Sequence, residues 1–156
     1  MEKKKIFWKV PLFCIAAGVI AFNAVVFFIG QFTIIPLPDG TITSDNTRVL
    51  IMYGAIFIVT LIVGGKVFFR NMTRKEIFFS ASIIVVIGLI MDLTQWAFNI
   101  TTGPGAVFFM YAYQIFEWSS IVPQLLYLVN ENLRVASFIG SLTPYLFILF
   151  GKKEQV

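Results

Sequence analysis

Long apolar runs separated by short polar segments dominate the pattern of this 156-residue chain. The first three runs are long enough to cross a membrane, because the hydrocarbon core of a bilayer, about 30 Å thick, needs about 20 residues of α-helix. We therefore predict membrane-spanning helices over residues 6–30, 49–68 and 77–98. The short turn between the second and third runs makes these two helices a hairpin.

The polar segments carry signals that begin and end these helices. Thr73 and Glu76 have the spacing of a capping box, in which each side chain binds the backbone N–H of the other residue at a helix start. Residues 36–40 are rich in proline and glycine and predict an external turn. One of the residues 44–46 can then cap the second helix.

The last third of the chain is compatible with two topologies. Two more apolar runs, 106–129 and 135–150, follow a glycine- and proline-rich break, so five helices cross if both runs do. Five polar residues and a proline interrupt the first of these runs: Gln114, Glu117, Ser119, Ser120, Pro123 and Gln124. The alternative topology therefore has four crossing helices and one interfacial or re-entrant segment. We favour five, since a run so rich in Phe, Tyr, Leu and Val needs an apolar environment.

Lysine and arginine gather at the ends of the apolar runs and indicate the orientation. Lys3, Lys4 and Lys5 precede the first run, Lys9 lies near its start, and further cations lie between residues 66 and 75. Positive segments remain in the cytoplasm, so the amino terminus is expected inside. With five spans the pair Lys152 and Lys153 would lie outside, whereas with four spans only Arg48 and Arg134 would be external. The charge pattern by itself favours four.

Composition excludes several classes of protein. The chain is 58% hydrophobic with a mean hydropathy of +0.87, which is too apolar for an ordinary soluble domain. We expect one all-α domain over residues 1–156, in a plasma membrane of the bacterial type, with the bilayer as its first partner. The net charge of +4 is explained by topology rather than by nucleic acid. Without histidine and with Cys14 alone, neither a metal site nor a cofactor is expected.

One acid lies in the third helix where lipid would not tolerate it. Asp92 is 15 residues into the span and about 9 Å from its outer end, so it is expected to face the bundle interior or a cavity. Gly88, Gln95 and Asn99 fall on the same stripe of the helix as Asp92. Gly88 would leave room beside the carboxylate.

Other polar residues fall at comparable depth in the neighbouring spans. In the five-span topology Asn23, Tyr113 and Gln114 lie about 9 to 13 Å below the outer surface, near the level of Asp92. Glu117 lies deeper, so the two acids are interpreted as two stations on a path rather than as a bonded pair. Asp92, Glu117, Gln95, Asn23, Tyr113 and Gln114 are the predicted ligand- or proton-binding residues.

These residues support three functional hypotheses. The first is a small transport or ligand-binding component in which Asp92 binds a cation or takes up a proton. The second is a non-catalytic accessory or scaffold subunit, whose polar residues only specify helix packing in a larger complex or a homo-oligomer. The third is an intramembrane enzyme that uses Asp92 and Glu117, which we favour least because the common enzyme motifs and histidine are missing.

Overall fold

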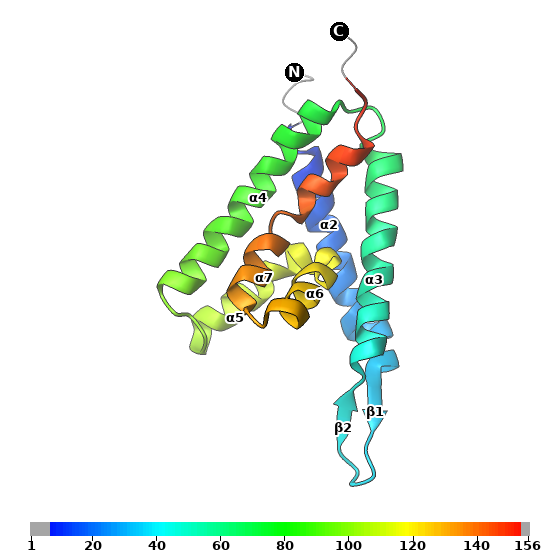
Figure 1. Ribbon diagram of the computed structural model, residues 1–156, viewed down its shortest axis with the longest axis vertical. Helices are drawn as coiled ribbons and strands as arrows, with labels where there is room; N and C mark the ends of the chain where they lie inside the picture. The colour runs from blue at the N-terminus through cyan, green and yellow to red at the C-terminus, as the bar shows by residue number, and fades with distance from the viewer. Residues whose placement is uncertain (1–6, 154–156) are drawn as a thin grey trace.

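A computed structural model, which describes residues 7–153, shows a bundle of helices with a short β-hairpin projecting from one end (Figure 1). The α-helices of this part of the chain are α2 (Lys9–Ala24), α3 (Asn46–Val63), α4 (Arg74–Ala97), α5 (Gly103–Ala112), α6 (Ile121–Asn130) and α7 (Leu133–Gly140). Shorter helical segments cover Val25–Ile29, Gly30–Thr33, Gly64–Phe68, Tyr113–Ser119 and Thr143–Phe150. We call Tyr113–Ser119 the central segment and Thr143–Phe150 the terminal segment. The predicted start of the first helix at residue 6, and the basic residues Lys3, Lys4 and Lys5, lie outside the described residues.

Four helices in the described part of the chain are long and apolar enough to cross a membrane: Lys9–Thr33, Asn46–Phe68, Arg74–Ala97 and Leu133–Phe150. Their length and composition support association with a membrane. The bundle of five spans that we favoured is not confirmed, because the predicted helix 106–129 is broken into three pieces.

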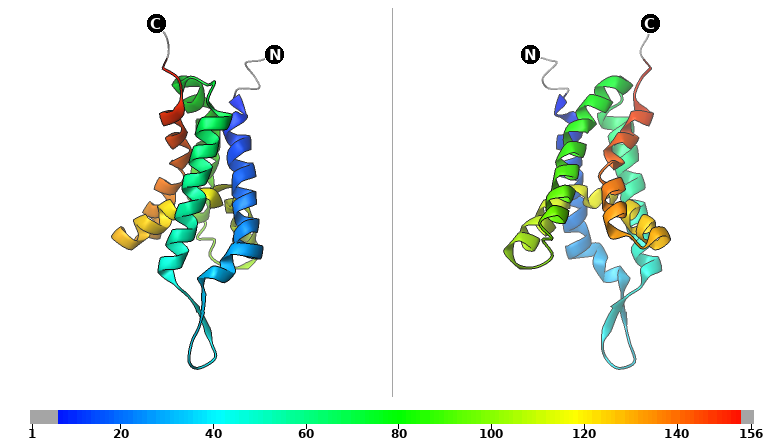
Figure 2. Two further views of the ribbon diagram at one scale, coloured as in Figure 1. Left: turned by 90° about the vertical axis from the view of Figure 1, so that its right-hand side faces the viewer. Right: turned by 60° about the vertical axis from the view of Figure 1, so that its left-hand side comes forward.

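Residues 103–130 enter the bundle and return to the same end of it. Helix α5 starts near the end of α4, the central segment crosses beside α2 at mid-height, and α6 turns back (Figures 1 and 2). Gly18 of α2 permits this contact, since a Cβ there would collide with the backbone carbonyls of Gln114 and Ile115. The apolar side chains of this segment thus find protein as well as lipid to pack against, without crossing.

Both ends of the described chain lie at one end of the bundle, which we call the terminal end (Figure 1). The backbone N–H of Lys152 donates to the carbonyl of Met72 at 3.0 Å, and Arg74 N–H donates to the carbonyl of Lys152 at 3.1 Å. Ser80 of α4 ties the start of α2, accepting from Val10 N–H at 3.1 Å and donating to the Phe7 carbonyl at 2.8 Å.

The capping signals act as the sequence predicts. Thr73 Oγ1 accepts from Glu76 N–H at 3.2 Å and Glu76 Oε2 accepts from Thr73 N–H at 2.8 Å, so the capping box of α4 is complete. Asp45 caps α3, and Asn132 caps α7 by accepting from Arg134 N–H and Val135 N–H. The α6–α7 turn is short because Glu131 adopts a left-handed conformation at φ 50°.

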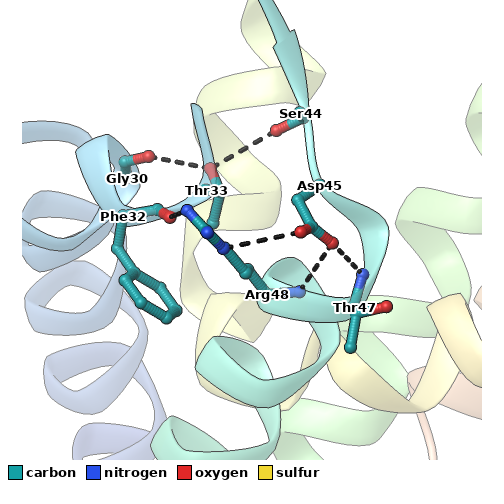
Figure 3. Close-up of polar contacts among 7 residues, drawn as sticks. All are labelled: Gly30, Phe32, Thr33, Ser44, Asp45, Thr47 and Arg48. Carbon is teal, nitrogen blue, oxygen red and sulfur yellow. Dashed lines mark hydrogen bonds and ion pairs between the residues drawn. The ribbon is translucent and has the colours of Figure 1, made fainter. Parts of the chain in front are cut away.

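The β-hairpin forms the end opposite the termini, which we call the hairpin end. Strands β1 (Ile34–Pro36) and β2 (Ile42–Ser44) pair antiparallel and extend beyond the helices (Figure 2). Arg48 contacts the residues that flank the two strands (Figure 3). Its guanidinium forms an ion pair with Asp45 at 3.4 Å, donates to the Phe32 carbonyl at 3.3 Å and lies over the Phe32 ring.

An aromatic cluster fills the terminal half of the bundle. Phe147 of the terminal segment is fully buried and contacts the rings of Phe13, Phe69 and Trp118 at centroid distances of 5.6, 4.9 and 5.4 Å. The Phe13 and Phe69 pairs meet edge to face, the arrangement that aromatic rings favour. This packing joins α2, the α3–α4 turn, the central segment and the terminal segment.

Candidate functional site

Asp92 lies on the inward face of α4 and is only 7% exposed. Its Oδ1 accepts hydrogen bonds from the Tyr113 hydroxyl at 2.8 Å and from Ser137 Oγ at 2.6 Å. Its Oδ2 accepts from Ser141 Oγ at 2.7 Å. We call Asp92, Tyr113, Ser137 and Ser141 the polar cluster. It joins α4, the central segment, α7 and the residue that follows α7 at a single carboxylate.

Gly88 makes this approach possible, as its position on the same stripe indicated. A Cβ on Gly88 would lie 2.6 Å from Phe116 Cζ and 2.9 Å from Ser141 Oγ. Real Cβ atoms do not approach other atoms so closely, so any larger residue would displace the ring or the serine. The glycine thus admits both the aromatic ring and the hydroxyl donor one helical turn before Asp92.

Asp92, Tyr113 and Ser137 of the polar cluster line a pocket of about 400 Å³, which we call the Asp92 pocket. Exposed residues from the α4–α5 connection and the start of α7 also line it: Asn99, Thr101, Leu133 and Arg134. Gln95, Trp96, Pro123 and Phe138 complete its walls. The volume falls in the range of small-molecule sites, which combine apolar walls with a few directed polar groups.

Two opposite charges line the Asp92 pocket. The Arg134 guanidinium lies over the Trp96 ring, 5.4 Å from its centroid, which is a cation–π contact. Within the part of the chain that the structure describes, no ion pair joins Asp92 to a cation. The hydroxyl donors therefore stabilise the carboxylate without neutralising its charge.

Glu117 is half-buried in the central segment and has separate surroundings. Its Oε1 accepts from the Tyr53 hydroxyl of α3 at 2.7 Å and its Oε2 accepts from Ser120 Oγ at 3.3 Å. A smaller cavity of about 160 Å³, the inner cavity, is lined by Glu117 and Ser120 and also by Tyr113, Ser137 and Ser141 of the polar cluster. Hydroxyl groups thus line the space between the two acids, which do not bond to each other.

The other predicted residues divide into two groups. Gln95 lines the Asp92 pocket, and its Nε2 donates to the Ile100 carbonyl at 3.2 Å, which stabilises the turn after α4. Gln114 is half-buried in the central segment, where its backbone carbonyl packs against Gly18 of α2. Asn23 is exposed, and its Nδ2 donates to the Val19 carbonyl of its own helix at 2.8 Å, so it takes no part in the site.

Four residues of the site were not predicted to belong to it: Tyr53, Arg134, Ser137 and Ser141. Ser137 and Ser141 have the small-xxx-small spacing, which indicates close helix packing, and they do pack against α4. Their hydroxyls carry no signal of a partner in the sequence. Arg134 resembles any cation at a helix end, and Tyr53 one of many aromatic residues in apolar helices.

Comparisons of the chain with models of protein families, with curated proteins and with solved structures find no match. The assignment of function therefore depends on the geometry of the two acids and the cavities beside them.

Proposed function

We propose that this protein is a multi-pass membrane protein that binds a small polar ligand in the Asp92 pocket, as a binding or transport component. The observation that carries the proposal is a buried carboxylate that lines a pocket together with exposed residues and forms no ion pair with a cation among residues 7–153. Intramembrane acids are costly, at about 3 kcal/mol near the bilayer centre, and usually mark binding sites or ion paths.

Charge distribution supports an orientation with the terminal end in the cytoplasm. Lys9, the cations between residues 66 and 75, and the pair at residues 152–153 all lie at the terminal end. Arg48 lies in the first turn of α3, beside the hairpin, and Arg134 lies at the start of α7, at the end of that helix that faces away from the terminal end (Figure 1). In a plasma membrane that follows the positive-inside rule, the Asp92 pocket then opens toward the outside. Re-entry of residues 103–130 brings both described ends of the chain to the cytoplasmic face.

The inner cavity supports a transport role in addition to binding. Three hydroxyl-bearing residues of the polar cluster line this cavity, and Glu117 lines it as well. A proton or small cation released from Asp92 therefore has oxygen acceptors between the polar cluster and Glu117. The aromatic cluster closes the bundle beyond Glu117. Passage to the cytoplasm would require that cluster to move, in the manner of a gate.

A scaffold role is the second candidate, favoured by one observation. The three hydrogen bonds to Asp92 join the last described span to α4 and to the central segment, so they also serve as packing contacts. Such bonds contribute about 0.6 kcal/mol each within membranes. A scaffold would need these contacts and would have a partner in place of a free pocket.

Cysteine accessibility separates the two roles. In a Cys14→Ala background, which removes the chain's one cysteine, Gln95→Cys lines the pocket and Thr94→Cys is the matched control outside it. A membrane-impermeant cationic thiol reagent added to the hairpin side should modify Gln95→Cys at least about tenfold faster than Thr94→Cys, since thiolates react according to access. Equal rates would contradict the proposal. Protection of Gln95→Cys in native membranes, lost on purification, would favour a bound partner and the scaffold role.

A further inference from the structure

We propose that the Asp92 pocket selects a zwitterion: a ligand with a cationic group for Asp92 and an anionic group for Arg134. This inference rests on the proposed function, and it specifies the chemical class of the ligand. A ligand with a single charge would meet repulsion at one end of the pocket, because the two fixed charges have opposite sign. Specificity of this kind comes from repulsion of wrong ligands as much as from attraction of the right one.

The carboxylate end has capacity left for one more donor. A carboxylate offers about four acceptor positions, and the polar cluster occupies three of them, two on Oδ1 and one on Oδ2. An ammonium group fits the remaining position, since it is a compact donor of opposite charge. It would also supply the neutralising charge that the described residues do not provide.

The arginine end is preorganised and unoccupied by protein groups. Within residues 7–153, no protein acceptor bonds the Arg134 guanidinium, which lies over the Trp96 ring. Stacking uses the face of the guanidinium and leaves its N–H edges free for a carboxylate or phosphate. Arg48 is the contrast: its guanidinium lies over Phe32 at the same distance of 5.4 Å, but two of its five N–H donors already face Asp45 and the Phe32 carbonyl.

The position of Trp96 relative to Asp92 on α4 indicates the length of the ligand. Trp96, beneath Arg134, is one helical turn or about 6 Å beyond Asp92 along α4. Apolar walls from Pro123, Leu133 and Phe138 lie in the same pocket. A short chain of methylene groups between an ammonium and an acidic group matches this arrangement. Two sources carry that chemistry: a free amino acid, or the head group of a zwitterionic phospholipid.

The test uses protection of Gln95→Cys in nanodiscs of phosphatidylglycerol, a lipid without an ammonium group. The probes are β-alanine, γ-aminobutyrate and ε-aminocaproate, each compared with its methyl ester, which keeps only the cation, and its N-acetyl form, which keeps only the anion. At least one zwitterion should protect at a concentration about tenfold or more below both of its derivatives, since each derivative loses one charge-assisted hydrogen bond.

Matched variants assign each half of the ligand. Arg134→Gln should remove the advantage of the zwitterion over its methyl ester. Asp92→Asn should remove the advantage of the zwitterion over its N-acetyl form. Arg48→Gln, the control, should leave both advantages unchanged. Nanodiscs that contain phosphatidylethanolamine provide the second arm: slower modification than in phosphatidylglycerol, reversed by Arg134→Gln, would identify the lipid head group as the source.

Three results would overturn the inference. Protection by an ester equal to that of its zwitterion would indicate a site for simple cations and would leave the proposed function intact. Protection that persists unchanged in both Arg134→Gln and Asp92→Asn would mean that the two charges do not select the ligand. If no zwitterion protected Gln95→Cys in phosphatidylglycerol and phosphatidylethanolamine did not slow its modification, zwitterion selection would be refuted. The modification rate of Gln95→Cys relative to Thr94→Cys would still test the proposed function separately.

Discussion

The two halves of this bundle are built on opposite principles. At the terminal end, the fully buried rings of Phe69 and Trp118 both pack against Phe147, and the Trp118 Nε1–H has no hydrogen-bond partner among the described residues. Toward the hairpin end, the Asp92 carboxylate accepts hydrogen bonds from three hydroxyl groups and lines a pocket of about 400 Å³. The difference indicates a bundle closed on one side and accessible from the other. A binding site that loads from one face has this form, whereas an open channel does not.

Removing a ring from the closed half should have the largest effect. Phe147→Ala should lower the free energy of unfolding by about 3–5 kcal/mol, because it leaves a cavity among rigid rings. Leu149→Ala is the control, since Leu149 is 73% exposed in the same segment and should cost much less. The measurement is detergent titration of the purified protein in mixed micelles. Equal losses for the two variants would mean that the aromatic cluster is not the stabilising core.

The contact between α2 and the central segment depends on Gly18. Gly18→Ala should lower the free energy of unfolding by about 1–3 kcal/mol, since the new methyl group meets the backbone of the central segment, which cannot rotate away. Gly54→Ala in α3 is the matched control, because nothing lies within 4 Å of its Cβ position, and it should be neutral or slightly stabilising. Tolerance of Gly18→Ala would argue against re-entry of residues 103–130 beside α2.

In the half of the bundle that contains the Asp92 pocket, two variants separate the effect of the hydrogen bonds of Asp92 on stability from the effect of its charge. Asp92→Ala should cost about 2 kcal/mol of unfolding free energy, because three hydroxyls lose their acceptor, although serines can turn to carbonyls of their own helix. Asp92→Asn keeps an acceptor and should cost about 1 kcal/mol or less. The same detergent titration measures both. If the two variants were equally destabilised, the charge itself would have a structural role and the ligand-binding interpretation would weaken.

The smallest expected effect concerns the deeper acid. Tyr53→Phe removes the 2.7 Å donor of Glu117 and should cost about 0.6 kcal/mol, the average for hydrogen bonds between membrane helices. Tyr145→Phe, which removes a 3.0 Å contact with Ser82 away from both acids, is the control. If Glu117 receives protons from Asp92, Tyr53→Phe should also alter the pH dependence of proton flux into reconstituted vesicles, and Tyr145→Phe should not. An unchanged flux profile would make Tyr53 a packing residue only.

The sequence by itself determined the features that depend on local pattern. Helix length and hydropathy indicated the three early spans, and the spacing of Thr73 and Glu76 predicted the capping box that α4 contains. The stripe of Gly88, Asp92 and Gln95 predicted an inward acid with space beside it, since a buried charge in an apolar helix can hardly face lipid. These signals act within one helix and need no knowledge of its neighbours.

Only the tertiary structure decided which faces meet. Lipid is as apolar as a protein core, so an apolar helix such as α2 does not reveal its inward side, and Asn23 was therefore placed in a chamber that it does not line. The packing of the broken segment 106–129 against α2 requires Gly18, a residue of a distant helix. The pairing of Asp92 with Ser137 and Ser141 likewise depends on how the last span packs against α4. Contacts between distant segments, which hydropathy does not encode, built the site.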